Sequence, residues 1–535
     1  MILDSRSLPR NAVVDTDVCI VGAGAAGITL AREFLNQPFN VCLVESGAER
    51  LDRTIQSLSQ GDNAGIPYYP LDECRQRALG GTTHLWMGWC APFEEMDFEE
   101  REWVPFSGWP FPRSALVPFY ERAQRVCQIG PFVYDVGPWE TPERPRLPFL
   151  DERIITKTFQ FSPPTRFGTV YRDELARAGN LKTLLHGTAV ELEATESAGQ
   201  VARLHVASSR DHRFAIAAKV FILAAGGIET PQLLLLSNRV HKAGLGNQND
   251  QVGRCFMEHP YCNTAAFVPA DRNLHLGMYF PHTAGPASGA VRMAGTLAIA
   301  PATLSREKIE NCVFFFPGQY KVHADFQSYG VRSLFHVFHA VRQGALPSDF
   351  AKRSVGILRD VHKVFRTGMR MATESRRRSR ERWILRSFLE AGPNPDSRVT
   401  LSERHDALGR NRVRLDWRPS ELDRRSWVRA HEIVDEELRR SRLGRLHMTS
   451  EFAQSTWPPS VDGGCHHAGT TRMHVDPRRG VVDEHCRVHG IENLFIAGPS
   501  VFPTSGSANP MLTIVALALR LADRVKGILR APPSP

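Results

Sequence analysis

One short stretch near the N-terminus limits the fold more than any other part of the chain. Residues 17–21 (DVCIV) are an apolar run typical of a buried strand, GAGAAG follows at 22–27, and a helical pattern continues to Leu35. A second apolar run at 41–44 ends at Glu45, about twenty residues past the glycines. This order of strand, GxGxxG, helix, strand and acid predicts a Rossmann-like α/β unit that binds a dinucleotide.

Each residue of the motif has a physical role in such a unit. Gly22 permits the tight turn after the strand, Gly24 lets the backbone approach a pyrophosphate, and Gly27 lets the helix pack closely on the strand. Glu45 is placed to accept a hydrogen bond from a ribose hydroxyl. The unit alone does not distinguish NAD from FAD.

Further stretches have the composition of the same kind of domain. Residues 75–86 (RQRALGGTTHLW) hold paired glycines and threonine hydroxyls, which suit a loop against a ligand. Residues 184–193 resemble a strand and a turn. The apolar run 219–225 predicts another buried strand. Residues 226–231 lead from it into an apolar helix predicted at 232–237, which suggests the same sheet.

The C-terminal part carries the candidate chemistry. An apolar run at 494–497 suits a buried strand, a loop rich in Gly, Pro and Ser spans 498–509, and a helical pattern covers 511–525. Pro510 stands at the start of that helix, where proline is favoured. The helix N-terminus offers free N–H groups and about half a positive charge, which suits negative charge on a ligand.

Three side chains near that helix are candidates for acid–base work. The imidazoles of His466 and His467 lie upstream, in CHHAGTTRM, and the amide of Asn509 lies at the helix start. A histidine has an ordinary pKa of about 6.5, which suits a base at neutral pH. His467 is either a neighbour or a second participant in this role. Asn509 is a candidate N-cap as well as a candidate ligand of the substrate.

The composition excludes several classes of protein. With 535 residues, 42% hydrophobic and 23% charged, the chain reads as a globular protein of more than one domain. The ten cysteines include no CxxC pair, so no metal site is expected, and their scatter favours a reducing compartment. Neither a signal peptide nor a run of about 18 apolar residues is seen, so a cytoplasmic location is expected. No nucleic-acid motif accompanies the local basic residues, so nucleic-acid binding is not expected.

The chain resembles the glucose–methanol–choline (GMC) family of FAD-dependent alcohol oxidoreductases in four motifs and in their order. These motifs are GAGAAG, GGTTHLW, GGIETPQLLLLS and HHAGTTRM…SGSANPMLTI. The resemblance implies FAD rather than NAD, and an α/β fold with a Rossmann-like FAD-binding domain assembled from discontinuous segments. It also implies a substrate domain with an antiparallel sheet that covers the flavin. The implied boundaries are 1–100, 180–260 and 461–535 for the first domain and 101–179 and 261–460 for the second, with a basic helical insertion near 331–388.

The resemblance also assigns roles to single residues. The residues matched to the cofactor are Gly22, Gly24, Gly27, Glu45, Gly80, Gly81, Thr82, Val190, Gly498, Ser500, Asn509 and Pro510. Val190 matches a backbone contact with adenine, the loosest match of the set. Gly498 and Ser500 match residues beside the ribityl chain, where this chain reads AGPS and many members read DAS. His466 matches the catalytic histidine, and Asn509 matches the second catalytic position.

The family's chemistry implies a mechanism for this chain. His466 would take the hydroxyl proton of an alcohol while a hydride passes to flavin N5, and Asn509 would orient the alcohol oxygen. Some relatives attach FAD covalently to a histidine a few residues past the paired glycines. Here that position is Leu85, and His84 lies one residue earlier, so non-covalent FAD is expected.

The expected substrate is a sugar, a polyol or a sugar-containing metabolite, because HHAGTTRM and SANPMLT resemble bacterial sugar-oxidising members and pyranose oxidases. A hydrophobic alcohol such as a sterol or terpenoid is the first alternative. A flavin-binding electron-transfer subunit is the second. The expected electron acceptors are oxygen, a quinone or a redox partner protein.

The middle of the chain has an unusual charge. Between Arg342 and Arg386 there are thirteen Lys/Arg and four Asp/Glu, a surplus of nine that equals the net charge of +9. Apolar residues recur there at helical spacing, namely Leu334, Phe335, Phe338, Val341, Ile357, Leu358, Val361, Val364 and Phe365. The favoured interpretation is a solvated helix face over a core stripe. The alternative is a basic amphipathic helix that contacts an anionic membrane or an acidic partner through residues 342–386.

Overall fold

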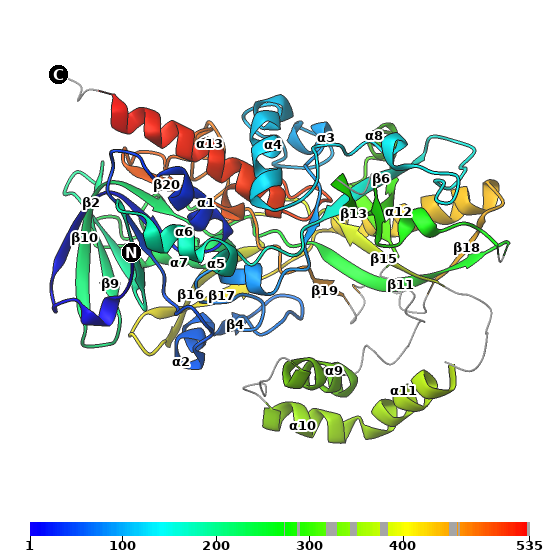
Figure 1. The fold of residues 1–535 in the computed structure, drawn as a ribbon, viewed down its shortest axis with the longest axis horizontal. Coiled ribbons are helices and arrows are strands. Elements are labelled where there is room, and N and C mark those ends of the chain that lie inside the picture. The colour runs from blue at the N-terminus through cyan, green and yellow to red at the C-terminus, as the bar shows by residue number, and fades with distance from the viewer. Residues whose placement is uncertain are drawn as a thin grey trace.

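The computed structural model describes residues 1–271, 273–285, 289–316, 329–342, 350–374, 383–448, 457 and 461–531. Two sheets lie at opposite ends of the long axis, and helix α13 (Met511–Arg530) runs along the first of them toward the middle of the molecule (Figure 1). The predicted pairing of a Rossmann-like domain with an antiparallel domain is confirmed. The predicted residue boundaries between the two domains stay a prediction.

The first sheet is assembled from segments that lie far apart in the sequence. Its strand order is β1–β7–β3–β2–β10–β9–β8, and β20 pairs with β10. The bounds are β1 (Ile2–Asp4), β7 (Leu181–Leu185), β3 (Val41–Val44), β2 (Val13–Val21), β10 (Arg213–Leu223), β9 (Val201–Ala207), β8 (Thr188–Ala194) and β20 (Leu494–Ile496). The strands from β1 to β10, together with β20, are parallel, whereas β9 and β8 are antiparallel. The predicted strands at 17–21, 41–44, 219–225 and 494–497 all lie in this sheet.

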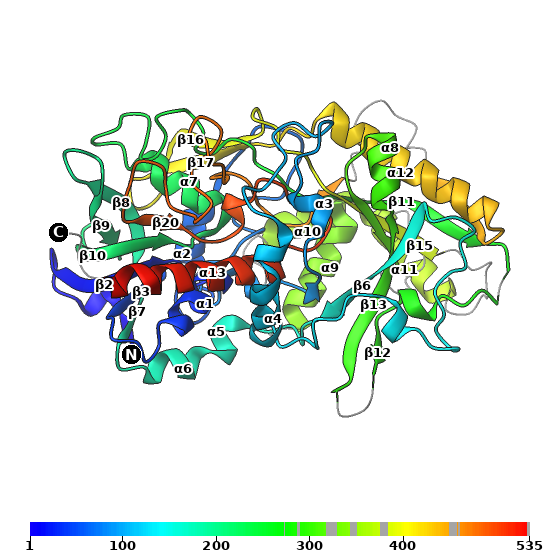
Figure 2. The same cartoon turned by 90° about the horizontal axis from the view of Figure 1, so that it is seen from above.

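Helices cover this sheet and join its segments. Helix α1 (Ala25–Glu33) follows β2 and packs against α13, and α7 (Gly226–Leu236) follows β10. Helix α4 (Val117–Val126) packs against the other end of α13, as Figure 2 shows. A proline lies in the first turn of α4, a position that is compatible with a helix.

The second sheet is antiparallel throughout and has the order β18–β11–β15–β14–β13–β6–β5. Two short strands, β12 (His282–Ala284) and β19 (Asp462–Gly463), pair with β13 and β11. The long strands are β18 (Gly444–Met448), β11 (Pro260–Pro269), β15 (Trp383–Leu389), β14 (Cys312–Phe315), β13 (Val291–Ile299), β6 (Ile154–Phe161) and β5 (Trp89–Cys90).

Helix α12 (Glu421–Arg440) covers one face of this second sheet. Ser420 and Asp423 form a capping box at its start, and the buried Trp427 donates a hydrogen bond to Ser387 of β15 at 3.1 Å. Because side chains alternate along a strand, Arg386 and Phe388 of β15 point to the opposite face, toward the first domain.

A small third sheet joins β16 (Arg398–His405), β17 (Asn411–Asp416) and β4 (Gly61–Asn63). The strands predicted near 397–401 and 412–417 are confirmed as the antiparallel pair β16–β17. This sheet packs against α7, so it supports the first domain from the side.

Helices α9 (Tyr329–Arg342), α10 (Phe350–Arg359) and α11 (Val361–Glu374) form a separate group that lies beneath the body in Figure 1. The favoured interpretation of their apolar residues as a core stripe is wrong for Phe338, Leu358 and Phe365, which are 63%, 70% and 67% exposed. Ile357 and Val364 are half-buried. Helical periodicity shows that an apolar face exists but not what covers it. The side chain of Phe335 lies outside the described residues.

All ten cysteines are free thiols. Among the helices that the structure describes, none is long and apolar enough to cross a bilayer. Within the same described residues, no group of three His, Cys, Asp or Glu side chains is arranged to hold a metal ion.

Candidate active site

A cavity of about 580 Å³ lies where the two domains meet. One end is lined by Glu45 and the start of β8, and the other by His466, Asn509 and Phe388. Between these ends it passes the β2–α1 turn and the start of α7. The carboxyl ends of parallel strands form this wall, which is where doubly wound sheets bind their ligands.

The conformation and packing of the β2–α1 turn agree with the roles predicted for its glycines. Gly22 has φ +102°, and a Cβ there would lie 2.7 Å from the carbonyl oxygen of Ala224. A Cβ on Gly27 would lie 1.8 Å from the carbonyl oxygen of Gly22, so helix α1 can approach its strand only without a side chain. A Cβ on Gly24 would meet nothing within 4 Å, because Gly24 faces the cavity.

Glu45 ends β3 at the cavity wall. Its carboxylate accepts hydrogen bonds from the backbone N–H of Ala23 at 2.9 Å and of Gly47 at 2.7 Å. Burial raises the pKa of Glu45, although these two bonds act in the opposite direction. Each carboxylate oxygen accepts one of the two bonds and keeps a further lone pair, so Glu45 can also accept from a ribose hydroxyl.

The glycine pair after residue 79 bends a loop against the same turn. Gly80 has φ +100°, and its N–H donates to the carbonyl oxygen of Ala23 at 2.8 Å. Gly81 and Thr82 line the cavity, whereas Gly80 supports them from behind. The ring Nε2 of His84 lies 2.7 Å from the Leu79 carbonyl oxygen, and this bond keeps His84 off the cavity wall.

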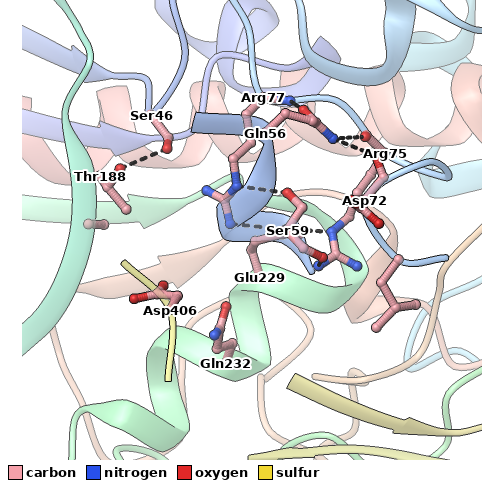
Figure 3. Close-up of polar contacts among 12 residues, drawn as sticks. Ser46, Gln56, Ser59, Asp72, Arg75, Arg77, Thr188, Glu229, Gln232 and Asp406 are labelled. Atoms are coloured by element: carbon pink, nitrogen blue, oxygen red, sulfur yellow. Dashed lines mark hydrogen bonds and ion pairs between the residues drawn. The ribbon is translucent and has the colours of Figure 1, made fainter. Parts of the chain in front are cut away.

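A buried ion cluster fixes the segment that leads into this loop, and Figure 3 shows it. Arg75 Nε lies 2.5 Å and Arg77 Nη2 lies 3.2 Å from Oε1 of Glu229 on α7. Arg77 Nε also donates to Ser59 at 2.8 Å. Burial alone would raise the pKa of Glu229, but the two guanidinium groups lower it below its usual range. The sequence did not reveal this cluster, because its partners are separated by about 150 residues.

Val190 does not line the cavity, whereas its neighbour Ala189 does. The side chain of Val190 packs in a small core cluster with Leu58 and Leu408. The pairing of β8 with β9 shifts register between Ala189 and Glu191, so Val190 stands opposite no partner residue. Its role as a backbone contact for adenine stays a prediction, which this bulge favours.

The loop before α13 forms the other end of the cavity. Gly498 has φ +111°, and a Cβ there would meet nothing within 4 Å. Ser500 is fully buried behind the lining, and its hydroxyl has no hydrogen-bond partner among the described residues. Pro510 caps α13, and Asn509 makes no capping bond, so the N-cap interpretation of Asn509 is wrong. Both residues line the cavity.

His466 sits in the wall between Asn509 and a second histidine, His259. Its Nε2 lies 3.3 Å from the amide nitrogen of Asn509, and its Nδ1 lies 2.8 Å from Nδ1 of His259. The strand register explains the second contact. Pro260 pairs with Gly463 across β11 and β19, so the residues on either side are held together. Burial lowers the pKa of His466 well below 6.5, and the neighbouring histidines lower it further.

The hydrogen bonds of His259 fix the proton on His466. The Nε2 of His259 lies 2.8 Å from the carbonyl oxygen of Gly506, which can only accept, so this nitrogen carries the proton. Burial lowers the pKa of His259, so the ring is neutral and its Nδ1 is an acceptor. His466 must therefore donate from Nδ1. This leaves the lone pair of His466 on Nε2, which faces the cavity beside Asn509.

His467 is held differently. Its Nε2 lies 2.7 Å from the hydroxyl of Tyr68, which is also hydrogen-bonded to Glu258. Burial, assisted by the nearby Arg75, lowers the pKa of His467 to about 3. Glu258 accepts from the backbone N–H of His466 at 2.9 Å, so this network supports the loop that carries both histidines. Burial raises the pKa of Glu258 to about 7.

Tyr68, Glu258 and His259 were not predicted. Each is buried or half-buried and reaches its partner across about 190 residues or more. No local pattern in the sequence distinguishes them from residues of an ordinary core.

Aromatic rings complete the cavity on the side of the second sheet. Tyr261 and Phe388 are stacked with ring centroids 5.4 Å apart and an interplanar angle of 8°. The guanidinium of Arg386 lies 5.2 Å from the ring centroid of Tyr261 and 5.9 Å from that of Phe315. This wall therefore offers flat apolar surfaces beside the polar groups of His466 and Asn509.

Comparison with known proteins links the chain to one family. Residues 393–518 match the family model described as GMC oxidoreductase. The large subunit of fructose dehydrogenase from Gluconobacter japonicus is 24% identical over 97% of this chain and 99% of that protein. Paromamine 6'-oxidase from Streptomyces fradiae is 25% identical over 96% of this chain and 92% of that protein. Residues 393–518 therefore resemble the C-terminal part of a GMC oxidoreductase.

Solved structures share the fold over nearly the whole length. Pyridoxine 4-oxidase from Mesorbium loti aligns with a TM-score of 0.54 at 17% identity, covering 95% of this chain and 98% of that one. Formate oxidase aligns with a TM-score of 0.55 at 15% identity, covering 97% of this chain and 99% of that one. These alignments show the fold alone, and the family match and the relatives support an oxidoreductase.

The cavity fits FAD, the cofactor of this family. Bare backbone at Gly24 and Gly498 faces the cavity near its two ends, so room exists where a side chain would otherwise stand. The N-terminus of α1 offers N–H groups to a pyrophosphate, and Glu45 stands where the ribose of an adenosine would lie. The N-terminus of α13 is available to the flavin end.

Proposed function

We propose that this protein is a GMC oxidoreductase that oxidises the CH–OH group of a sugar, a polyol or a sugar-containing metabolite to a carbonyl, with His466 as the base. The observation that carries the proposal is the pair of contacts from His259 to His466 and to Gly506, which leaves the lone pair of His466 on Nε2 at the cavity wall. His467 is the weaker candidate, because its Nε2 is held by Tyr68 at 2.7 Å, whereas Nε2 of His466 has only the longer contact with the Asn509 amide at 3.3 Å.

The chain's own residues divide the work in this mechanism. The substrate hydroxyl gives its proton to Nε2 of His466 as the C–H bond breaks and the electron pair leaves with hydrogen as a hydride. FAD, when bound, supplies the hydride acceptor at N5. The Asn509 amide donates to the substrate oxygen and fixes its orientation, and the N-terminus of α13 stabilises negative charge beside it.

The substrate class rests on the relatives and on the cavity wall. The curated relatives of this chain include a fructose dehydrogenase subunit and a paromamine 6'-oxidase, both named for sugar-containing substrates. The stacked rings of Tyr261 and Phe388 offer a flat surface to a ring-shaped substrate. The same aromatic wall favours a second candidate, a hydrophobic ring alcohol such as a sterol or terpenoid.

FAD is proposed to be held without a covalent bond to the protein. Leu85 lines the cavity at the position where some relatives carry the attachment histidine, and His84 is bound to the Leu79 carbonyl at 2.7 Å. Precipitation with trichloroacetic acid should therefore release all the flavin into the supernatant. Yellow colour that stays with the washed pellet would contradict this arrangement.

The experiment that tests the function follows the flavin absorbance of the purified protein under anaerobic conditions. Sugars, polyols and aminoglycosides are compared with sterols and terpenoid alcohols, after the protein has been saturated with FAD. Bleaching by members of the first group is expected. Bleaching by the second group alone would replace the sugar assignment with the hydrophobic one, and no bleaching by any alcohol would contradict the proposed activity.

A further inference from the structure

The helices α9, α10 and α11 present a surface that the oxidation reaction does not use. They pack against one another and lie together in both Figure 1 and Figure 2. Arg353 of α10 makes an ion pair with Glu73 at 2.8 Å, which ties the group to the loop before the glycine pair. The carboxylate of Asp360 accepts from the N–H of Gly330 at 3.1 Å and joins α10 to α9.

The group has an apolar face that no other part of the described chain covers. Its exposed apolar side chains are 53–70% accessible, namely Phe338, Val341, Val355, Leu358, Val361 and Phe365. Phe338 and Val341 are three residues apart, and Val361 and Phe365 are four apart, so each pair lies on one side of its helix. Large apolar side chains exposed in such a group of packed helices indicate an interaction site.

The same segment carries the excess positive charge of the protein. Between Arg342 and Arg386 the surplus of basic residues is nine, and the remainder of the chain is balanced. Arg359 and Arg366 are exposed on α10 and α11 beside the apolar residues. Arg376, Arg377 and Arg378 belong to this segment by sequence and lie outside the described residues.

The combination selects one kind of partner. An acidic protein groove would complement the charge, but the exposed apolar side chains are spread over three helices and are not gathered on one. An anionic bilayer takes the apolar side chains among its acyl chains and the basic ones among its headgroups. We propose that α9, α10 and α11 form a docking surface for an anionic phospholipid bilayer, on which they lie in the interface.

Flotation with vesicles tests this directly on the full-length protein loaded with FAD. The vesicles contain equal parts of phosphatidylglycerol and phosphatidylcholine, or phosphatidylcholine alone. The wild type should float with the anionic vesicles at about 0.1 M salt and dissociate near 1 M, where the screening length falls to about 3 Å. Binding to phosphatidylcholine alone should be at least about tenfold weaker, because the headgroups then carry no net charge.

Two variants separate the apolar and basic contributions. The Leu358→Ser/Phe365→Ser variant should bind anionic vesicles at least about tenfold more weakly. The Arg359→Glu/Arg366→Glu variant should lose roughly fivefold for each side chain changed. The matched control is Leu150→Ser/Val475→Ser, which removes apolar side chains of similar exposure, 71% and 62%, outside the three helices. The control should bind as the wild type does.

Several outcomes would overturn the proposal. One is a wild type that fails to float with anionic vesicles. Another is equal flotation of the wild type and both helix variants. A third is self-association in the absence of lipid that Leu358→Ser/Phe365→Ser abolishes, because this would assign the face to a second copy of the chain. Unchanged flavin absorbance and melting temperature show that each variant is folded, so none of these readings depends on catalysis.

Discussion

Replacing His259 by leucine should slow flavin reduction without releasing the cofactor. Leucine has no acceptor for the Nδ1–H of His466 and no donor for the Gly506 carbonyl, so the tautomer of the base is no longer fixed. A buried hydrogen-bonding group left without its partner costs about 1–3 kcal/mol. Since about 1.36 kcal/mol corresponds to a tenfold rate change, reduction should slow by roughly 5- to 150-fold.

The matched variant is His259→Gln. A glutamine amide has an oxygen that accepts from His466 and an NH₂ group that donates to Gly506, so its rate should stay much closer to that of the wild type. The assay is anaerobic stopped-flow absorbance with a saturating reducing substrate, on protein whose flavin content and melting temperature match the wild type. Reduction of the His259→Leu variant at the wild-type rate would refute the assigned tautomer.

The pH profile and two glycine variants supply three further predictions. His466 accepts a proton only when neutral, and burial lowers its pKa well below 6.5, so kcat/KM should fall only as the pH drops below 6.5. A fall centred near pH 7 would instead implicate Glu258, whose pKa burial raises to about 7. Gly24→Val should weaken FAD binding measured by fluorescence while the melting temperature of the apoprotein stays unchanged, because its Cβ points into the cavity. Gly27→Ala should destabilise the fold by about 1–3 kcal/mol or more, because its Cβ overlaps the Gly22 carbonyl, and an unchanged melting temperature would contradict this.

The part of the fold that follows from local sequence was predictable. The unit from β2 to β3 is encoded by one continuous stretch of sequence. In it, a steric or hydrogen-bonding requirement explains each glycine of the motif and Glu45. The strand β20 and the helix α13 were likewise predictable, because an apolar run and a proline mark their starts. The boundaries of β10 and α7 were less accurate, because half-buried residues precede the apolar run of β10 and Pro231 lies inside α7.

The part of the site that depends on distant contacts was not predictable. His466 and Asn509 belong to short motifs and were found, but the tautomer of His466 depends on His259, which lies 207 residues earlier in the chain. That contact exists because β11 and β19 pair and place Pro260 opposite Gly463. Neither the pairing of β11 with β19 nor the contact between His259 and the Gly506 carbonyl can be recognised from a local pattern in the sequence.

The central claim is that His466 removes the hydroxyl proton of the substrate. The most direct measurement is the anaerobic rate of flavin bleaching in His466→Ala and His467→Ala, using a sugar or polyol that reduces the wild type. His466→Ala should keep its flavin and be reduced about 100-fold or more slowly, the usual contribution of a positioned base, whereas His467→Ala should be reduced far faster than that. Near-normal reduction of His466→Ala, with the loss seen in His467→Ala instead, would contradict the mechanism.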